Sequence, residues 1–265
     1  MGQIEAVFSD LDGTLLNNDH AVSDYNNQIM DACWAANIPF YIITGRAPQS
    51  IRTISTLKPK NMVGCFNGCI VENFDNNQIM YEMGIDLADN QAIIDTAHKN
   101  NFTAIWYSGK KVYTNKDDAL SQAYFHIGGL KPEICPFDEF AKTPLIKVVL
   151  KWHDEAKLDE AYTELTGQSN VNLWGTYSLA NSLELLNKNA NKGEAVKFIA
   201  NHYGYNLKNC IAFGDNANDV PMLDIVGQPV VMANGRQSVV NQYNEVAETA
   251  DNDGVGRYLQ KRLRL

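Results

Sequence analysis

The sequence predicts an α/β core that is interrupted by an inserted α+β domain. Short apolar runs alternate with amphipathic stretches at both ends of the 265-residue chain, a pattern typical of parallel strands joined by helical crossovers. The middle of the chain instead pairs its apolar runs around turn residues, as antiparallel hairpins do. We therefore expect residues 1–81 and 184–265 to build the core, and residues 82–183 to form the inserted domain.

The first 80 residues predict three strands and two helices in alternation. Ser23 can cap the first helix by accepting a hydrogen bond from a free backbone N–H, and Asn37 and Pro39 end that helix. The expected elements, in chain order, are a strand over Ile4–Ser9, a helix over Ser23–Ala36, a strand over Phe40–Thr44, a helix over Ala47–Leu57 and a strand over Met62–Phe66.

The inserted segment follows a transition over Tyr81–Leu87. Its expected elements are helices over Asp89–Asn100, Asp117–Ile127 and Glu155–Leu165, and strands over Thr103–Tyr107, Lys111–Thr114, Ile146–Trp152, Val171–Thr176 and Ser182–Leu186. The α/β alternation then returns. It consists of a helix over Lys192–Tyr203, a strand over Cys210–Phe213, a helical turn over Val220–Ile225 and a strand over Pro229–Met232.

Composition and charge limit the classes of partner. The chain is 45% hydrophobic and 20% charged, with a net charge of −9, as an ordinary globular protein can be. That negative charge argues against nucleic acid and anionic membranes, because both require a basic surface. It permits a small anionic substrate, since a metal and a few local cations can dominate a pocket.

The cysteines and the apolar runs bear on location. The five cysteines form no CxxC pair and no zinc-binding pattern, so we expect reduced, mostly buried thiols and a cytoplasmic protein. No apolar run reaches about 18 residues, the length that a membrane-spanning helix requires, and the first residues lack the pattern of a signal peptide.

Two carboxylates stand at the end of the first predicted strand. Asp10 and Asp12 are separated by one residue and followed by Gly13, and an extended chain points both side chains the same way. Two such charges repel unless a cation or a proton lies between them. Mg²⁺ is the natural candidate, because it takes hard oxygen ligands and needs few of them from protein. The segment predicts a metal-assisted site with a carboxylate nucleophile.

Two further segments can bind an anion. Thr44, at the end of the second strand, precedes Gly45 and Arg46 and offers a hydroxyl and backbone N–H groups to an oxyanion, although such a residue can simply cap a helix. Lys192 begins a helix, where the helix dipole disfavours a cation. A lysine there is better placed if it pairs with an anion and with Asp10.

A second acidic strand end completes the set. The run ending at Phe213 is followed by Gly214 and Asp215, with Asp219 four residues later. Asp219 could cap the next helix, near whose start Pro221 is well placed, but that role leaves Asp215 unexplained. Two acidic strand ends with a threonine and a lysine would together form a phosphate and metal site.

These four segments, in this order, resemble the haloacid dehalogenase (HAD) superfamily, with its DxDGTL, Thr, Lys and GDxxND motifs. An insertion between the Thr and Lys motifs is similar to the large α/β cap of the Cof-type sugar phosphatases. Phe66-Asn67-Gly68 and the tail Asp251–Gly256 resemble that subgroup too, whereas Met232–Gly235 departs from its usual Gly-Asn-Ala order. The resemblance implies a Rossmann-like parallel-sheet core, with a cap that reads the substrate.

The resemblance also implies residue roles. Asp10 would attack phosphorus and form an aspartyl phosphate, while Asp12 would protonate the leaving alcohol and then activate water. Phosphate would be bound by Thr44, Gly45, Arg46, Lys192 and Asn218, with Lys192 also holding Asp10. Mg²⁺ would be bound by the Asp10 carboxylate, the Asp12 backbone carbonyl and Asp215. Support would come from Thr14, which positions Asp12, and Asp219, which orients Lys192 or a metal-bound water.

The leading hypothesis is a Mg²⁺-dependent phosphatase of small phosphorylated metabolites, sugar phosphates foremost. The presence of Asp12 argues against dehalogenation, because dehalogenases of the superfamily lack that second acid and need no metal. A phosphomutase and a non-catalytic, phospholigand-binding regulator stay open as alternatives. The sequence does not choose the cap residues that read the leaving group, and either a monomer or a homodimer fits it.

Overall fold

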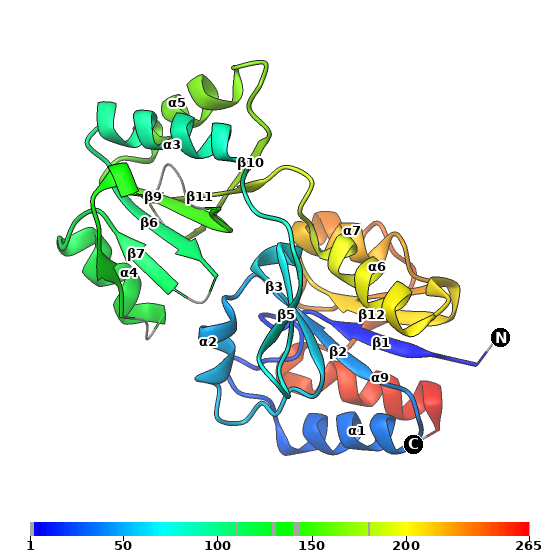
Figure 1. Ribbon diagram of the computed structural model, residues 1–265. Coiled ribbons are helices and arrows are strands. Elements are labelled where there is room, and N and C mark those ends of the chain that lie inside the picture. The colour runs from blue at the N-terminus through cyan, green and yellow to red at the C-terminus, as the bar shows by residue number, and fades with distance from the viewer. Residues whose placement is uncertain (1–2, 110, 129–130, 140–143, 180, 265) are drawn as a thin grey trace. The chain divides into compact units, whose positions relative to one another are not determined.

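The computed structural model describes residues 3–109, 111–128, 131–139, 144–179 and 181–264 (Figure 1). They form two compact units, one from the residues up to Tyr81 together with those from Asn191, and one from Glu82–Ala190. None of the helices in these described ranges has the length and apolar character that a membrane crossing requires. All five cysteines are free thiols, and four of them are buried.

The first unit is built on a sheet of eight strands, in which all neighbours pair in parallel except at one edge. Its order is β14 (Val246–Ala247), β13 (Gln228–Met232), β12 (Cys210–Gly214), β1 (Ala6–Ser9), β2 (Phe40–Ile43), β3 (Met62–Cys65), β4 (Ile70–Asn73) and β5 (Gln78–Glu82). The register pairs Ser9 of β1 with both Phe213 and Ile42. Because β12, β1 and β2 are adjacent and parallel, the residues that follow them meet at the carboxyl end of these strands.

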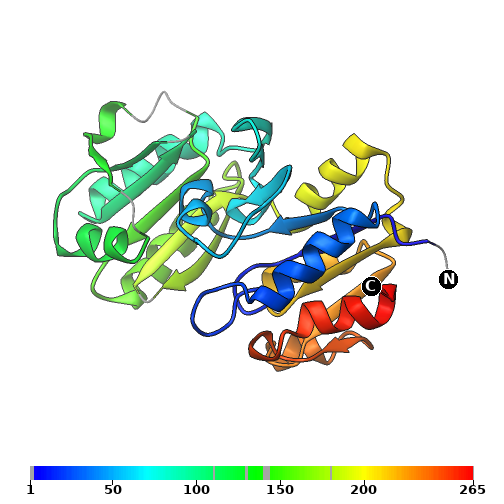
Figure 2. The same ribbon diagram turned by 90° about the horizontal axis from the view of Figure 1, so that it is seen from below.

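Helices cover both faces of this sheet. Figures 1 and 2 show α1 (Asp24–Ala35) and α9 (Gly254–Leu263) side by side on one face, with α6 (Lys192–Tyr203) and α7 (Val220–Leu223) on the other. Phe8 and Ile43 from the sheet pack against Val196 and Ile199 of α6. Each such fully buried side chain contributes roughly 1.5–3 kcal/mol relative to an exposed one, so this layer fixes the strand ends that carry polar residues.

Most elements expected for the core are present, but one expected helix is shorter and several elements were missed. The predicted cap is confirmed, since Ser23 Oγ accepts a hydrogen bond from the Asn26 N–H. Helix α2 covers only Pro48–Arg52, because the chain continues in tighter turns, with the N–H of Ile54 on the carbonyl of Ile51. The sequence analysis missed the antiparallel edge β4–β5, α8 (Gln237–Val240) with β14, and α9.

The second unit is a six-stranded sheet whose neighbours pair antiparallel except β7 with β8. Its order is β10 (Leu173–Leu179), β11 (Ser182–Asn187), β9 (Lys147–Lys151), β6 (Thr103–Ser108), β7 (Lys111–Thr114) and β8 (Glu133–Ile134). Trp106 packs in the apolar cluster beneath α3 (Leu87–Lys99) and α5 (Glu155–Thr166). The next side chain, Tyr107, points the other way and meets Tyr124 of α4 (Ala119–Gly128).

The second boundary of the inserted unit differs from the expected one. The sequence analysis placed it between residues 183 and 184, which falls inside β11. This strand pairs with both β9 and β10 of the six-stranded sheet, and Asn187 donates a hydrogen bond to the carbonyl of Gly84 in the same unit. The inserted unit therefore extends to Ala190, and the first unit resumes at Asn191.

Candidate active site

Three strand ends of the first unit bring the expected site residues together. Asp10 follows β1, and its backbone N–H donates to the carbonyl of Phe213 in β12. Thr44 follows β2, and Asp215 follows β12. The edge formed by the carboxyl ends of parallel strands is where α/β folds bind ligands. Asp10 and Thr44 are buried there, whereas Asp215 is half-buried.

Lys192 lies among these residues, between the carboxylates of Asp10 and Asp219. Its Nζ is 2.5 Å from Asp10 Oδ1 and 2.5 Å from Asp219 Oδ1, and its side chain is only 1% exposed. Burial opposes the ammonium form, but the carboxylates of Asp10 and Asp219 outweigh burial and raise the pKa of Lys192. The lysine therefore stays charged, and α6 carries a cation at its first residue because two buried carboxylates compensate it.

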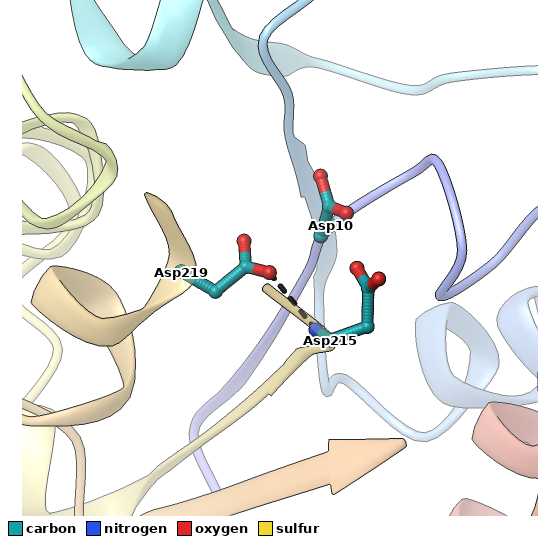
Figure 3. Close-up of side chains that lie close together, drawn as sticks. All are labelled: Asp10, Asp215 and Asp219. Carbon is teal, nitrogen blue, oxygen red and sulfur yellow. Dashed lines mark hydrogen bonds between the residues drawn. The ribbon is translucent and has the colours of Figure 1, made fainter. Parts of the chain in front are cut away.

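Asp219 is a positioning residue in this arrangement. Its Oδ1 accepts from Lys192, and its Oδ2 accepts from the backbone N–H groups of Asp215 and Asn216, each at 2.9 Å. Both carboxylate oxygens are therefore engaged by protein donors. Figure 3 shows the bond from Asp219 to the Asp215 backbone. Asp219 thus contacts both Lys192 and the loop after β12, and its predicted role in orienting Lys192 stays a prediction.

Asp215 faces Asp10 across the hydroxyl of Thr14. Thr14 Oγ1 lies 3.2 Å from Asp215 Oδ1 and 3.5 Å from Asp10 Oδ2. Burial, with the charge of Asp219, raises the pKa of Asp215 to about 6. Gly13 makes this approach possible, because its φ is +77° and a Cβ there would lie 2.6 Å from Asp215 Oδ2. Thr14 thus contacts Asp10 and Asp215, whereas the sequence analysis expected it to position Asp12.

The carboxylates fit a bound divalent cation. Oxygens of Asp10, Asp215 and Asp219 lie within 4.8 Å of one another (Figure 3), and burial raises the pKa of Asp10 well above its usual value despite Lys192. Three carboxylates thus face one ammonium, and the surplus negative charge favours a cation or a proton. Since Asp219 is already engaged, Asp10 Oδ2 and Asp215 are the oxygens that could hold Mg²⁺, a cation that needs few protein ligands.

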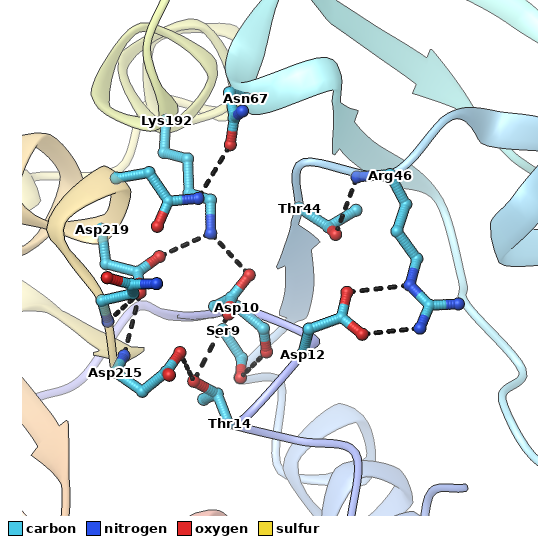
Figure 4. A network of polar contacts seen from close by, with 12 residues as sticks. Ser9, Asp10, Asp12, Thr14, Thr44, Arg46, Asn67, Lys192, Asp215 and Asp219 are labelled. Carbon is cyan, nitrogen blue, oxygen red and sulfur yellow. Dashed lines mark hydrogen bonds and ion pairs between the residues drawn. The ribbon is translucent and has the colours of Figure 1, made fainter. Parts of the chain in front are cut away.

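Asp12 has a different environment from Asp10. Strand β1 ends at Ser9, so the extended geometry assumed for the two acids does not hold. Figure 4 shows the Asp12 carboxylate in a two-pronged ion pair with Arg46, with Nε at 2.8 Å and Nη2 at 2.6 Å. The Asp12 side chain is 46% exposed. The expectation that Arg46 is available for phosphate is therefore not met in this conformation.

Thr44 and Gly45 retain free donors. Thr44 Oγ1 accepts from the Arg46 backbone N–H at 3.1 Å, which leaves its own hydroxyl proton available. Among the described residues, neither that proton nor the Gly45 N–H has a recorded acceptor. Asn218 is half-buried and donates through Nδ2 to Asn67 Oδ1 at 2.9 Å. The expected phosphate-binding groups therefore lie on loops that contact one another.

Two residues that the sequence analysis did not place in the site support it. Asn67 accepts from Asn218, as above. Asn234 donates from Nδ2 to the Gly13 carbonyl at 2.7 Å and accepts from the Ala250 N–H. The Met232–Gly235 segment, which departs from the family order, thus braces the turn after Asp12. The signal for Asn234 was its place two residues after the end of β13, close to a strand end, as Thr44 and Asp215 are.

Comparison with known proteins agrees with this geometry. A family model described as haloacid dehalogenase-like hydrolase matches residues 7–259. A Haemophilus influenzae protein named "Putative phosphatase" is 31% identical over 265 residues, which cover 98% of this chain and 98% of that protein.

Solved structures show the same fold. A haloacid dehalogenase-like hydrolase from Bacteroides thetaiotaomicron has a TM-score of 0.87 at 21% identity, over 98% of this chain and 100% of that chain. A structure described as a HAD subclass IIB sugar phosphatase has a TM-score of 0.79 at 18% identity, over 98% of this chain and 99% of that chain. With its motifs on three adjacent strand ends and the family model spanning almost its full length, the chain belongs to the haloacid dehalogenase-like hydrolase family.

Proposed function

We propose that the protein is a Mg²⁺-dependent phosphatase that acts through an aspartyl phosphate on Asp10. The observation that carries this proposal is the environment of the Asp10 carboxylate, meaning its burial and its contacts. Asp10 is 4% exposed, Lys192 holds its Oδ1, and its Oδ2 faces Asp215. A buried carboxylate held by a lysine and surrounded by surplus negative charge is suited to attack an anionic centre once a cation is bound.

In the first half of the reaction, an oxygen of Asp10 forms a bond to phosphorus as the bond from phosphorus to the ester oxygen breaks. Asp12, in its protonated form, gives a proton to the leaving oxygen. The hydroxyl of Thr44 and the N–H of Gly45 donate to phosphoryl oxygens, because no acceptor among the described residues uses them. Positioning and charge stabilisation supply most of the rate in such transfers.

In the second half, water loses a proton to the Asp12 carboxylate and attacks phosphorus, which releases inorganic phosphate and restores Asp10. Asp12 must give up at least part of its ion pair with Arg46 to take either role. The freed guanidinium then becomes available to the phosphoryl oxygens, as planar donors suit phosphate. The Asp12–Arg46 pair is therefore a resting arrangement that substrate would replace.

Asp10 Oδ2 and Asp215 would hold Mg²⁺, together with the Asp12 backbone carbonyl. When bound, the cation would supply the positive charge that shields Asp10 from the anionic substrate and neutralises the phosphoryl oxygens. Lys192 holds the other Asp10 oxygen, and its positive charge favours the carboxylate form of Asp10 that attacks phosphorus.

Small phosphorylated metabolites are the proposed substrates, with sugar phosphates foremost. The name of the Haemophilus influenzae relative supports a phosphatase, and the description of a solved structure of the same fold as a sugar phosphatase supports sugar phosphates as substrates. The inserted unit between Thr44 and Lys192 is the part proposed to read the leaving group. The five free thiols support a reducing compartment such as the cytoplasm as its place of action.

The test is phosphate release from a panel of sugar phosphates and p-nitrophenyl phosphate, with Mg²⁺ or with EDTA, for wild type and Asp10→Asn. We expect turnover that requires Mg²⁺ and that falls at least 10³-fold in the variant, because the nucleophile is lost. Glu5→Gln is the matched control, since Glu5 precedes β1 at the amino end of the strand, opposite to Asp10, and accepts hydrogen bonds from Asn206 and Asn209. Isomerised sugar phosphate without free phosphate would indicate a mutase, and ligand binding without turnover a regulator.

A further inference from the structure

The turn after β3 is strained and is not used by the mechanism above. Phe66, Asn67 and Gly68 have φ angles of +50°, +54° and +93°. Two consecutive non-glycine residues in the left-handed region are unusual, and such conformations persist only where the surrounding structure holds them. Here the N–H groups of Phe66 and Asn67 donate to the carbonyls of Arg46 and Thr44, each at 3.0 Å. The strained turn is thus fastened to the proposed phosphate-binding loop.

The same turn touches the segment that carries Lys192. A Cβ on Gly68 would lie 2.1 Å from the Asn191 carbonyl oxygen, so only glycine permits this approach. Asn67 Oδ1 accepts from Asn218 Nδ2 at 2.9 Å, and a Cβ on Gly45 would lie 3.1 Å from that same oxygen. Figure 4 shows Asn67 above the side chain of Lys192. One turn therefore joins the loops after β2 and β12 to the start of α6.

The choice of asparagine at position 67 carries information. Glycine adopts a positive φ without the steric penalty that any side chain adds. Six described asparagines have positive φ, and the other five are exposed or half-buried. Asn67 alone among these six is buried, with 7% exposure. A buried side chain at a position that glycine would occupy more easily indicates that the amide group itself has a structural or functional role.

We propose that Asn67 is a positioning residue of the phosphoryl-binding site, an inference that rests on the function proposed above. Its amide oxygen accepts a hydrogen bond from Asn218 and packs against Gly45. Its backbone N–H donates to the carbonyl of Thr44. Removing the amide leaves Asn218 without its acceptor and leaves the loop after β2 without a spacer. Because a misplacement of about 1 Å can cost about a hundredfold in rate, turnover should suffer although Asn67 itself touches no reacting atom.

The experiment compares full-length wild type with Asn67→Gly in the presence of Mg²⁺. Three quantities are measured: the kcat/KM for p-nitrophenyl phosphate, the Kd of inorganic phosphate by calorimetry, and the thermal midpoint. We expect kcat/KM to fall at least tenfold and phosphate to bind more weakly, with a thermal midpoint close to that of wild type, because relief of the strain at positive φ offsets the lost hydrogen bond and the greater freedom of the unfolded chain. Asn37→Gly is the control, since Asn37 has a φ of +57° but is exposed, and it should leave activity within twofold.

A double-variant comparison separates positioning from a general structural effect. Asn218→Ala removes the donor without altering the strained turn, so it should reproduce part of the loss even if Asn67→Gly does not fold. The kcat/KM of the combined variant should be about equal to that of the less active single variant, because the two residues act through one contact. Asn67→Gly activity within twofold of wild type, or losses that multiply in the combined variant, would overturn the inference. If wild type binds phosphate but hydrolyses no ester, the proposed function fails, while the change in phosphate Kd still tests Asn67.

Discussion

At the scale of single residues, the site is organised around one buried cation. Lys192 pairs with Asp10 and Asp219 at 2.5 Å each, and Asp215 adds a third carboxylate, whose Oδ1 lies 3.2 Å from Thr14 Oγ1. Removing one partner of a buried pair typically costs about 3–5 kcal/mol, because the other charge is left uncompensated. Asp215 differs, because among the described residues it forms no ion pair, and the uncompensated charge that it brings should lower stability.

Substitution of Asp215 by Asn should stabilise the metal-free protein. Burial raises the pKa of Asp215 to about 6, so the folded state holds a proton that the unfolded state loses near pH 4. The stability of wild type should therefore fall as pH rises from about 4 to about 6 and stay reduced above that range. In EDTA at pH 8, we expect Asp215→Asn to raise the free energy of unfolding by about 1–2 kcal/mol after allowance for solvent screening.

Urea denaturation at pH 8 and pH 4.5 measures this effect, and the gain should shrink at the lower pH. Asp31→Asn is the control, because the Asp31 side chain is 70% exposed in a surface pair. Mg²⁺ should stabilise wild type and leave Asp215→Asn unchanged, since a ligand stabilises only the state that binds it. A variant less stable than wild type at pH 8 in EDTA would contradict the account of surplus charge.

The residues predicted from the sequence are those with a local signal. Asp10, Thr44 and Asp215 each follow an apolar strand, and parallel neighbours bring such ends together. The partner of Asp12 was not predictable in this way, because the Arg46 side chain reaches it across a turn whose geometry depends on where β1 ends. Asn67 was noticed only as part of a family motif, since its strain is a property of φ and not of residue spacing.

At the scale of elements, α6 links stability to the site. Its first residue is Lys192, and the next, Gly193, is so close to α7 that a Cβ would lie 2.5 Å from the Pro221 carbonyl oxygen. The helix is capped at its carboxyl end by Gly204, whose φ is +76°. A Cβ added to Gly204 would have no other atom within 4 Å. The two glycines lie roughly 16 Å apart along the helix, so they offer matched probes of its two ends.

Gly193→Ala should reduce both stability and turnover, whereas Gly204→Ala should reduce stability alone. The first variant overpacks the contact with Pro221, at a cost of about 1–3 kcal/mol, and shifts Lys192, so kcat/KM should fall at least tenfold. The second places alanine in a left-handed conformation, at a cost of about 1 kcal/mol. Chemical denaturation and p-nitrophenyl phosphate kinetics measure the two effects. Equal losses of kcat/KM in both variants would mean that this helix does not position Lys192 through its start.

Most elements with regular periodicity were predicted closely, whereas a strand without it and a helix that begins with glycines were missed. The expected helix over Lys192–Tyr203 matches α6 at both ends, and the hairpin of β6 and β7 is confirmed. Strand β5 was missed, since its residues are exposed or half-buried and show no alternation. Helix α9 was missed because it starts with Gly254 and Gly256, which are poor helix formers, although its apolar face packs near α1.

At the scale of the whole molecule, each of the two units has an apolar cluster of its own among the described residues. One cluster includes Phe8, Val196 and Ala212 of the first unit, and the other includes Trp106 and Val148 of the inserted unit. Every proposed catalytic and metal-binding residue belongs to the first unit. This division explains why the sequence motifs predict site residues but leave substrate choice open, since the motifs lie outside the inserted unit that is proposed to read the leaving group.

The division also predicts where ligands add stability. Mg²⁺ with inorganic phosphate at 100 times its Kd should stabilise the first unit by about 2.7 kcal/mol, which slows hydrogen exchange about a hundredfold for amides that exchange only when that unit unfolds. Exchange should slow in β1 and β12 and stay unchanged in β6 and β9, and Asp10→Asn should abolish the slowing. Equal slowing in all four strands would show that the two cores unfold as one cooperative body. Slowing confined to the first unit would mean that each core holds its own stability, so that the inserted unit can vary in sequence without weakening the site.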